Sequence, residues 1–201
     1  NKQDFVFALT DISKQKQAEN ELRKLANYDS LTGLPNRALL LDRVAHAIQH
    51  CQRRNQELAL FFVDLDRFKQ VNDSLGHDIG DLLLINVTHT IRRSIRHDDT
   101  LARLGGDEFV VLLEDISGID SINRVAQNII QQMKEPMILN GHQIAVSPSI
   151  GIAIYPNDGG DATQLLKHAD VAMYHAKNAG RNNFQYFENS MNHVARKRLK
   201  L

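Results

Sequence analysis

The stretch that decides the fold runs from Leu101 to Leu113 and reads LARLGGDEFVVLL. Apolar residues typical of strands stand on both sides of the Gly105-Gly106 pair, which predicts a β-hairpin that turns at the glycines. Because glycines carry no side chains, the backbone of this turn can approach a ligand closely. Asp107 and Glu108 follow directly, so two acids stand beside a bare stretch of backbone.

A second acidic group ends a continuous apolar run. Residues 58–65 read LALFFVDL, which predicts a buried strand, and Asp66 comes next. Alternation along the strand places Asp64 and Asp66 on one side of it. If the hairpin lies beside this strand, three or four carboxylates meet at one edge of the sheet. Such carboxylates repel each other, and a hard cation such as Mg²⁺, shared with a substrate phosphate, would relieve the repulsion. The alternative is a set of ordinary solvated acids at a strand end.

The whole-chain composition narrows the class of protein. The 201 residues include 24 basic and 24 acidic side chains, and 42% are hydrophobic. These values are typical of a soluble globular domain and disfavour both disorder and a broad nucleic-acid-binding face. No apolar run approaches the roughly 20 residues of a membrane span, and no secretory signal opens the sequence. The lone Cys51 excludes an internal disulfide framework. We expect a cytoplasmic segment of a longer protein, one that could be anchored in a membrane elsewhere.

Helical and strand patterns alternate along the chain. Helices are predicted over 37–53, 68–75, 79–95, 120–134 and 162–176, and strands over 58–65, 101–104, 109–113, 137–139, 142–155 and 184–187. We therefore expect an α/β (α+β) fold, a mixed central β-sheet flanked by helices, over residues 28–187. Residues 1–12 are interpreted as the end of an upstream domain, 13–27 as a linker helix, and 188–201 as a linker helix towards a possible downstream domain. The stripe of Ala18, Leu22 and Leu25 fits either pairing with a second copy or a solvated helix.

Four stretches, in order, resemble the signatures of the GGDEF family, the diguanylate cyclases. They are DSLTGLPNR at 29–37, the segment 64–81, RLGGDEF at 103–109 and the segment 169–182. The resemblance covers residues 28–187 and implies a fold like the palm of polymerases and class III nucleotidyl cyclases. It implies that two GTP molecules are condensed into cyclic di-GMP, with release of pyrophosphate. It also implies a homodimer, because two domains face each other in antiparallel fashion and each holds one GTP.

The same resemblance assigns roles to the acids. Asp64, Asp107 and the backbone carbonyl of Leu65 match the ligands of Mg²⁺ or Mn²⁺. Glu108 matches the residue that holds a second metal or helps to deprotonate the ribose 3′-hydroxyl. The implied catalytic group is therefore Asp64, Asp107 and Glu108, and a divalent cation bound there would acidify a hydroxyl and stabilise phosphate charge.

Residues implied to bind GTP are spread over three motifs. They are Arg67, Phe68, Lys69, Asn72, Asp81, Gly105, Gly106, Lys177 and Arg181. Asn72 and Asp81 match the guanine readers, and backbone N–H groups near Arg67 would cradle the β- and γ-phosphates. Lys177 and Arg181 match the γ-phosphate contacts, and their spacing of four predicts one face of a helix end. An ordinary cationic helix terminus is the alternative for this pair.

Arg96 and Asp99 precede the glycines in an Arg-x-x-Asp pattern. This spacing resembles the family's product-inhibition site, where cyclic di-GMP binds, although a surface ion pair of little energy would look the same. The flanks resemble a PAS sensor domain upstream and a linker that in this family often leads to an EAL phosphodiesterase domain.

Two rival functions stay open. One is a catalytically silent GGDEF module that binds GTP or cyclic di-GMP and regulates its neighbour, which the intact signature disfavours. The other is a palm-fold transferase that acts on nucleic acid, which the neutral charge disfavours.

Overall fold

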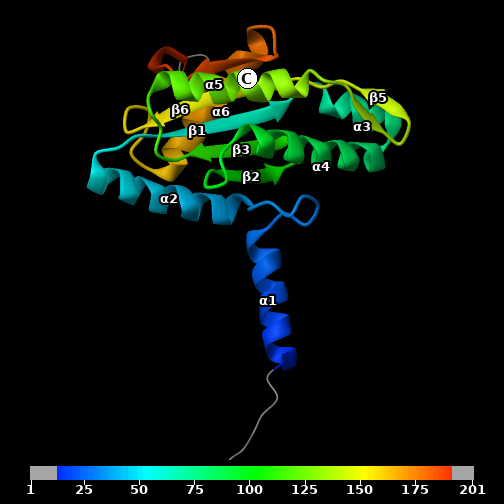
Figure 1. Cartoon of the computed structure of the whole chain (residues 1–201), viewed down its shortest axis with the longest axis horizontal. Helices are drawn as coiled ribbons and strands as arrows, with labels where there is room; N and C mark the ends of the chain where they lie inside the picture. Colours follow the sequence, from blue (N-terminus) through cyan, green and yellow to red (C-terminus); the bar gives the residue numbers. More distant parts are fainter. Residues whose placement is uncertain (1–12, 192–201) are drawn as a thin grey trace, which may run out of the picture.

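The computed structural model describes residues 13–191, and for 13–15 and 17–20 it describes the backbone only. The predicted end of a sensor domain at 1–12 and the residues of the tail after Met191 lie outside the described part. In Figure 1, helices cover a central sheet, and α1 (Ser13–Asn27) projects away from it. Leu22 and Leu25 on this helix are exposed. None of the helices within the described residues combines the length and hydropathy of a membrane span.

The central sheet has five strands in the order β2-β3-β1-β6-β7. All neighbours are antiparallel except β6 and β7, which are parallel, so the predicted mixed sheet is confirmed. The strands are β1 (Leu58–Leu65), β2 (Thr100–Gly105), β3 (Glu108–Leu113), β6 (Pro148–Tyr155) and β7 (Asn183–Tyr186). A separate hairpin pairs β4 (Met137–Leu139) with β5 (His142–Ile144).

Helices bury both faces of β1, which explains its unbroken apolar sequence. Phe61 and Val63 pack in one core cluster, together with residues of α3 (Phe68–Leu75), α4 (His77–Ser94) and α5 (Ile119–Met133). Leu60 and Phe62 point to the other cluster, with α2 (Arg37–Arg54) and α6 (Ala162–Asn178). The central strand is thereby fixed from both sides, and so is the acid at its carboxyl end.

A close approach of α6 to β6 sets the position of that helix. A Cβ atom added to Gly151 would stand 2.0 Å from the carbonyl oxygen of Ala169, so only glycine fits at this point of the strand. The side chain of Asp161 caps the helix by accepting a hydrogen bond from Gln164 N–H. With its start capped and its middle tight against the sheet, α6 directs its last turn towards the end of β1.

The prediction of one continuous strand over 142–155 is wrong. The structure breaks it after Ile144, and β6 begins at Pro148, which has no N–H group to offer a ladder. Between the two strands, Ser147 accepts a hydrogen bond from the backbone of Asp66 at 2.8 Å. The break therefore lies next to Asp66, at the edge of the sheet that also carries the candidate site. The chain ends its described part in a single 3₁₀ turn at Asn189–Met191.

Candidate active site

The two acidic groups predicted from the sequence meet at one sheet edge. In the register of β1 and β3, Asp64 lies directly opposite Glu108. Asp64 is buried, and burial together with the nearby charges of Asp107 and Asp66 raises its pKa to about 6, against the opposing effect of Lys177. The expectation that the hairpin lies beside the first strand is therefore confirmed, and the acids do crowd one another.

Glu108 has a second acidic neighbour that the sequence analysis did not single out. Burial raises the pKa of Glu108, and the charges of Asp170 and Asp107 raise it further. Asp170 stands on α6, where burial raises its own pKa against the effects of Lys177 and Arg37. Both Asp170 and Arg37 lie within the stretches that resemble family motifs. Their position in these motifs is the feature of the sequence that could have indicated a place in the site.

Lys177 supplies the positive charge that this cluster needs. It extends from the last turn of α6, and its Nζ lies 2.7 Å from Asp64 Oδ1. Within residues 13–191, no three His, Cys, Asp or Glu side chains form a ready-made metal cluster. The donor set nevertheless fits Mg²⁺, because hard carboxylate oxygens converge there and substrate phosphates usually complete such a site.

Arg181 does not share a helix face with Lys177, so that prediction is wrong. The helix α6 ends at Asn178, and Gly180 and Arg181 have φ angles of 112° and 63°, which place them on a loop. The loop returns the chain to the same sheet edge, with Arg181 Nε 3.9 Å from Asp66 Oδ1. A turn that reverses the chain after Gly180 cannot be inferred from residue spacing.

The charge of Asp66 raises the pKa of Asp64, so Asp66 lies near the acidic cluster as expected, but its own carboxylate is bound by other partners. Its carboxylate is buried and accepts hydrogen bonds from Ser147 Oγ at 2.6 Å, from Ser149 Oγ at 2.7 Å and from Asn182 N–H at 3.1 Å. The two acids therefore face different partners: Asp64 pairs with Lys177, whereas Asp66 accepts hydrogen bonds from three neutral donors and lies at 3.9 Å from Arg181.

The residues predicted to read guanine lie at the junction of α3 and α4. Asn72 Oδ1 is buried and has no hydrogen-bond partner, and such an oxygen is costly to leave unpaired. Gly80 keeps room for it, since an added Cβ would stand 1.9 Å from that oxygen. Asp81 follows Gly80 and is exposed. At the other end of α3, Arg67 precedes the helix with a φ of 62°, Phe68 is buried and Lys69 is exposed.

An ion pair that the sequence analysis missed holds the glycine turn. Arg103 Nη1 lies 2.9 Å from Asp29 Oδ1, while its Nη2 and Nε donate to the Gly106 carbonyl at 2.7 and 3.1 Å. Gly105 and Gly106 have φ angles of 142° and 50°, a conformation that favours glycine. The turn is therefore anchored to the loop that precedes α2.

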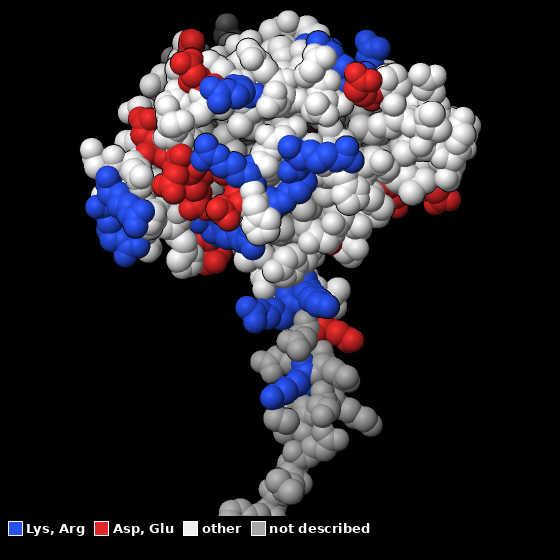
Figure 2. All heavy atoms as spheres, in the orientation of Figure 1, with Lys and Arg blue, Asp and Glu red and all other residues white. Residues whose placement is uncertain are grey.

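The face seen in Figure 2 carries acidic and basic side chains side by side above α1. This face offers no single broad basic surface of the kind that neutralises a nucleic-acid backbone.

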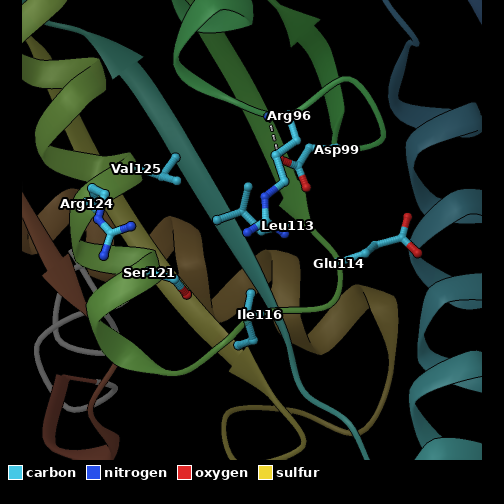
Figure 3. A pocket seen from close by; sticks show the side chains of 8 residues that line it. All are labelled: Arg96, Asp99, Leu113, Glu114, Ile116, Ser121, Arg124 and Val125. Carbon is cyan, nitrogen blue, oxygen red and sulfur yellow. Dashed lines mark hydrogen bonds between the residues drawn. The ribbon is translucent and has the colours of Figure 1, made fainter.

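Arg96 and Asp99 lie at the opposite end of the hairpin from the glycine turn, beside the end of β3. Their contact runs through the main chain, because Arg96 N–H donates to Asp99 Oδ2 at 2.8 Å. They line a cavity of about 150 Å³, and Figure 3 shows Arg124 of α5 on its other side. The remaining lining residues are Leu113, Glu114, Ile116, Ser121 and Val125. This cavity is thus distinct from the acidic site.

Known proteins match this chain along nearly all of its described length. The family described as "Diguanylate cyclase, GGDEF domain" matches residues 26–183. MucR of Pseudomonas aeruginosa, a bifunctional diguanylate cyclase/cyclic di-GMP phosphodiesterase, is 48% identical over 92% of this chain. PdeR of Escherichia coli, a cyclic di-GMP phosphodiesterase, is 43% identical over 91% of it. The chain spans only 27% of the length of either relative.

A solved structure agrees with the fold. The GGDEF domain of TpbB (YfiN) from Pseudomonas aeruginosa superposes with a TM-score of 0.82 at 41% identity, covering 84% of this chain and 99% of that one. The expected palm-like fold is thereby confirmed. From the matching family and the relatives together, the chain belongs to the GGDEF family of diguanylate cyclase domains.

Proposed function

We propose that this domain condenses two molecules of GTP into cyclic di-GMP and releases two pyrophosphates, with Mg²⁺ or Mn²⁺ as cofactor. The observation that carries the proposal is the convergence of Asp64, Glu108 and Lys177 where β1 and α6 end and β3 begins, beside the glycine turn. Nucleotidyl transfer requires carboxylates that can hold a divalent metal ion, a positively charged side chain for phosphate, and backbone that a nucleotide can approach.

Asp64, Asp107 and the backbone carbonyl of Leu65 would hold the divalent cation. When bound, it supplies Lewis-acid stabilisation of phosphate charge and a lower pKa for a coordinated hydroxyl. Glu108 accepts the proton of the ribose 3′-hydroxyl or helps to hold a second ion. The raised pKa of Glu108 suits a general base, because proton transfer is most efficient when the pKa approaches the working pH.

The remaining residues bind the nucleotide. Asn72 Oδ1, buried and unpaired, would accept a hydrogen bond from the guanine edge, with Asp81 as the second reader. Lys177 leaves Asp64 for the γ-phosphate when metal and nucleotide enter, and Arg181 contacts the same phosphate. Backbone N–H groups of Gly105, Gly106 and the Arg67–Lys69 segment would hold the other phosphates.

Catalysis by this arrangement needs a homodimer. One domain offers one set of guanine readers and one acidic site, yet the product contains two guanosines. Two copies in antiparallel orientation would bring the 3′-hydroxyl of each GTP to the α-phosphate of the other. Each domain is thus half of a complete site.

The decisive experiment is an assay of GTP turnover with Mg²⁺ over a range of protein concentrations. We expect cyclic di-GMP as the product and an initial rate that rises more steeply than linearly with protein concentration, until dimerisation is complete. Chelation of Mg²⁺ should stop the reaction. A demonstrably dimeric sample that makes no product would contradict the proposal.

A catalytically silent module is the second candidate, favoured by the likeness to PdeR, which is named a phosphodiesterase. Such a module would bind GTP or cyclic di-GMP and regulate a linked EAL-type domain. The complete RLGGDEF segment and the paired Asp64 and Glu108 favour the cyclase over this alternative. We propose a cytoplasmic domain within a longer protein that also carries a sensor, with no nucleic-acid partner.

Product inhibition is a further part of the proposal, centred on the cavity of Arg96, Asp99 and Arg124. Arg96→Ala should weaken inhibition by cyclic di-GMP by about tenfold or more, the loss of one charge-assisted hydrogen bond. The initial rate before product accumulates should change little, and the exposed Arg93→Ala variant serves as a control. An inhibition constant equal to that of the parent would remove Arg96 from the inhibitory site.

A further inference from the structure

The second acid of the β1 end has no part in the chemistry proposed above. We propose that Asp66 is a positioning residue: it fixes the loop that carries Arg181 and thereby sets the preference of the site for a nucleoside triphosphate over a diphosphate. The inference rests on the proposed function, because it takes Arg181 as a γ-phosphate contact.

The contacts of Asp66 tie three separate segments together. Both carboxylate oxygens are used, by Ser147 and Ser149 at the start of β6 and by Asn182 N–H after α6. The backbone N–H of Asp66 also donates to the Ser147 carbonyl at 2.8 Å. A buried carboxylate is stable when several donors satisfy it, and here three hydrogen bonds of 2.6, 2.7 and 3.1 Å do so. Each bond also restrains its donor segment against β1.

The loop held by Asn182 has an unfavourable backbone conformation. Gly180, Arg181 and Asn182 follow one another at φ angles of 112°, 63° and 50°, and two of them carry side chains. Residues with a Cβ atom keep such angles where their surroundings enforce them. On the side of α6, the Asn183 side chain donates to the carbonyls of Ala176 and Arg181 at 2.9 and 2.8 Å. On the side of β1, Asp66 is the anchor.

The loop borders an open hollow of about 710 Å³, lined among others by Asp66, Arg181 and Asn182. Asp66 lies at the wall of the same hollow and holds the loop there by accepting a hydrogen bond from the Asn182 N–H. Without this bond, the loop would have room to move into the hollow, and Arg181 would move with it.

Among residues 13–191, only a long ion pair with Asp66 holds the head of Arg181 in this arrangement. Its Nε lies 3.9 Å from Asp66 Oδ1, beyond hydrogen-bond distance, and half of its side chain is exposed. Asp66 thus fixes the backbone from which Arg181 extends while its guanidinium stays available for an anion. Lys177, by contrast, is held by its side chain at Asp64. Asp64 thus positions Lys177, and Asp66 positions Arg181.

The test uses Asp66→Asn, which keeps the size of the side chain but replaces one acceptor oxygen with an amino group. A matched control is Asp158→Asn, since Asp158 likewise accepts a backbone N–H, that of Ile154 at 2.7 Å, at the other end of β6. Hydrogen exchange of the nucleotide-free protein is measured first. We expect the Asn182 amide to exchange at least about tenfold faster in Asp66→Asn and unchanged in Asp158→Asn, because one hydrogen bond to a charged group is lost.

Nucleotide affinity is measured next by calorimetry with GTP and GDP, in a Glu108→Gln background that prevents turnover. We expect Asp66→Asn to weaken GTP binding by about tenfold and GDP binding by less than about threefold, as Arg181→Ala does. The double variant with Arg181→Ala should be no worse than Arg181→Ala alone. A merely structural defect would weaken both nucleotides alike.

Three results would overturn the inference: unchanged exchange at Asn182, an unchanged ratio of GTP to GDP affinity, or additive effects in the double variant. If Asp66→Asn does not fold, Ser147→Ala removes one of the bonds that orient the carboxylate, and a GTP-selective loss is expected there too. A parent domain that binds neither nucleotide would overturn the proposed function itself, and the inference with it. If the parent domain binds GTP and Asp66→Asn binds it equally well, the inference is overturned but the proposed function is not.

Discussion

Glu108→Gln is expected to lower GTP turnover by about 10²- to 10⁴-fold, the range for loss of a general base. Glutamine has nearly the same size and keeps one oxygen, but it cannot take up a proton and carries no charge. GTP should still bind with an affinity within a few fold of the parent, because the residues proposed to hold guanine and the γ-phosphate lie on other elements. The effect should therefore appear in the rate and not in the binding constant.

The matched control for this variant is Glu57→Gln. Glu57 is exposed and precedes β1 at the end of the strand that is far from Asp64, so the same chemical change there should leave turnover unaffected. Turnover is measured as cyclic di-GMP formed per dimer, and binding by calorimetry on the same samples. Unchanged turnover in Glu108→Gln would remove Glu108 from the mechanism, and loss of GTP binding would assign it to the nucleotide site instead.

The parts of the site that follow from local pattern could be predicted from the sequence. The run 58–65 is apolar at every position but Asp64 because both faces of β1 are covered, and the glycine pair marks the hairpin turn. Once these two strands pair in antiparallel fashion, Asp64 near the carboxyl end of β1 lies opposite Glu108 at the start of β3. The roles of these acids in metal binding and catalysis were predicted from the resemblance to the family's motifs, because residue spacing alone does not indicate them.

The parts that depend on contacts between distant segments could not be predicted. Whether Arg181 continues a helix or leaves it is decided by the left-handed turn at Gly180 and by the bond from Asn182 to Asp66, which spans 116 residues. The break in the predicted strand 142–155 falls just before Pro148, which has no N–H group for the ladder, and there the Ser147 hydroxyl donates to the Asp66 carboxylate. In both places the buried Asp66 carboxylate at the sheet edge binds a segment that is distant in the sequence.

The ion pair of Asp29 with Arg103 should have the largest effect on stability. Arg103→Ala is expected to lower the free energy of unfolding by about 3 kcal/mol, since it leaves a largely buried carboxylate and the Gly106 carbonyl without their donor. For a domain of this size that corresponds to a fall in melting temperature of roughly 6–12 °C. The exposed Arg43, with one hydrogen bond to Thr100 at 3.2 Å, is the matched control, and Arg43→Ala should cost less than about 1 kcal/mol.

The pH dependence of this pair follows from Asp29. Burial acts to raise its pKa, but hydrogen bonds from Thr32 and Arg103 outweigh that effect and hold the pKa below its ordinary value of 3.8. A carboxyl with a lowered folded-state pKa stabilises the fold fully above its unfolded pKa. Its contribution is therefore complete at pH 7 and is lost only as the pH falls below 3.8 and through the folded-state value.

Arg103→Lys distinguishes the geometry of the clamp from its charge. A single ammonium group cannot reach Asp29 and the Gly106 carbonyl with the fixed fork of a guanidinium, so lysine should recover only part of the lost stability. Because the clamp ends on the turn that precedes Asp107 and Glu108, we expect turnover to stay low even at temperatures where the lysine variant is fully folded. Thermal melts and turnover on the same samples would test this. A lysine variant with full activity would show that the turn holds its shape without the arginine.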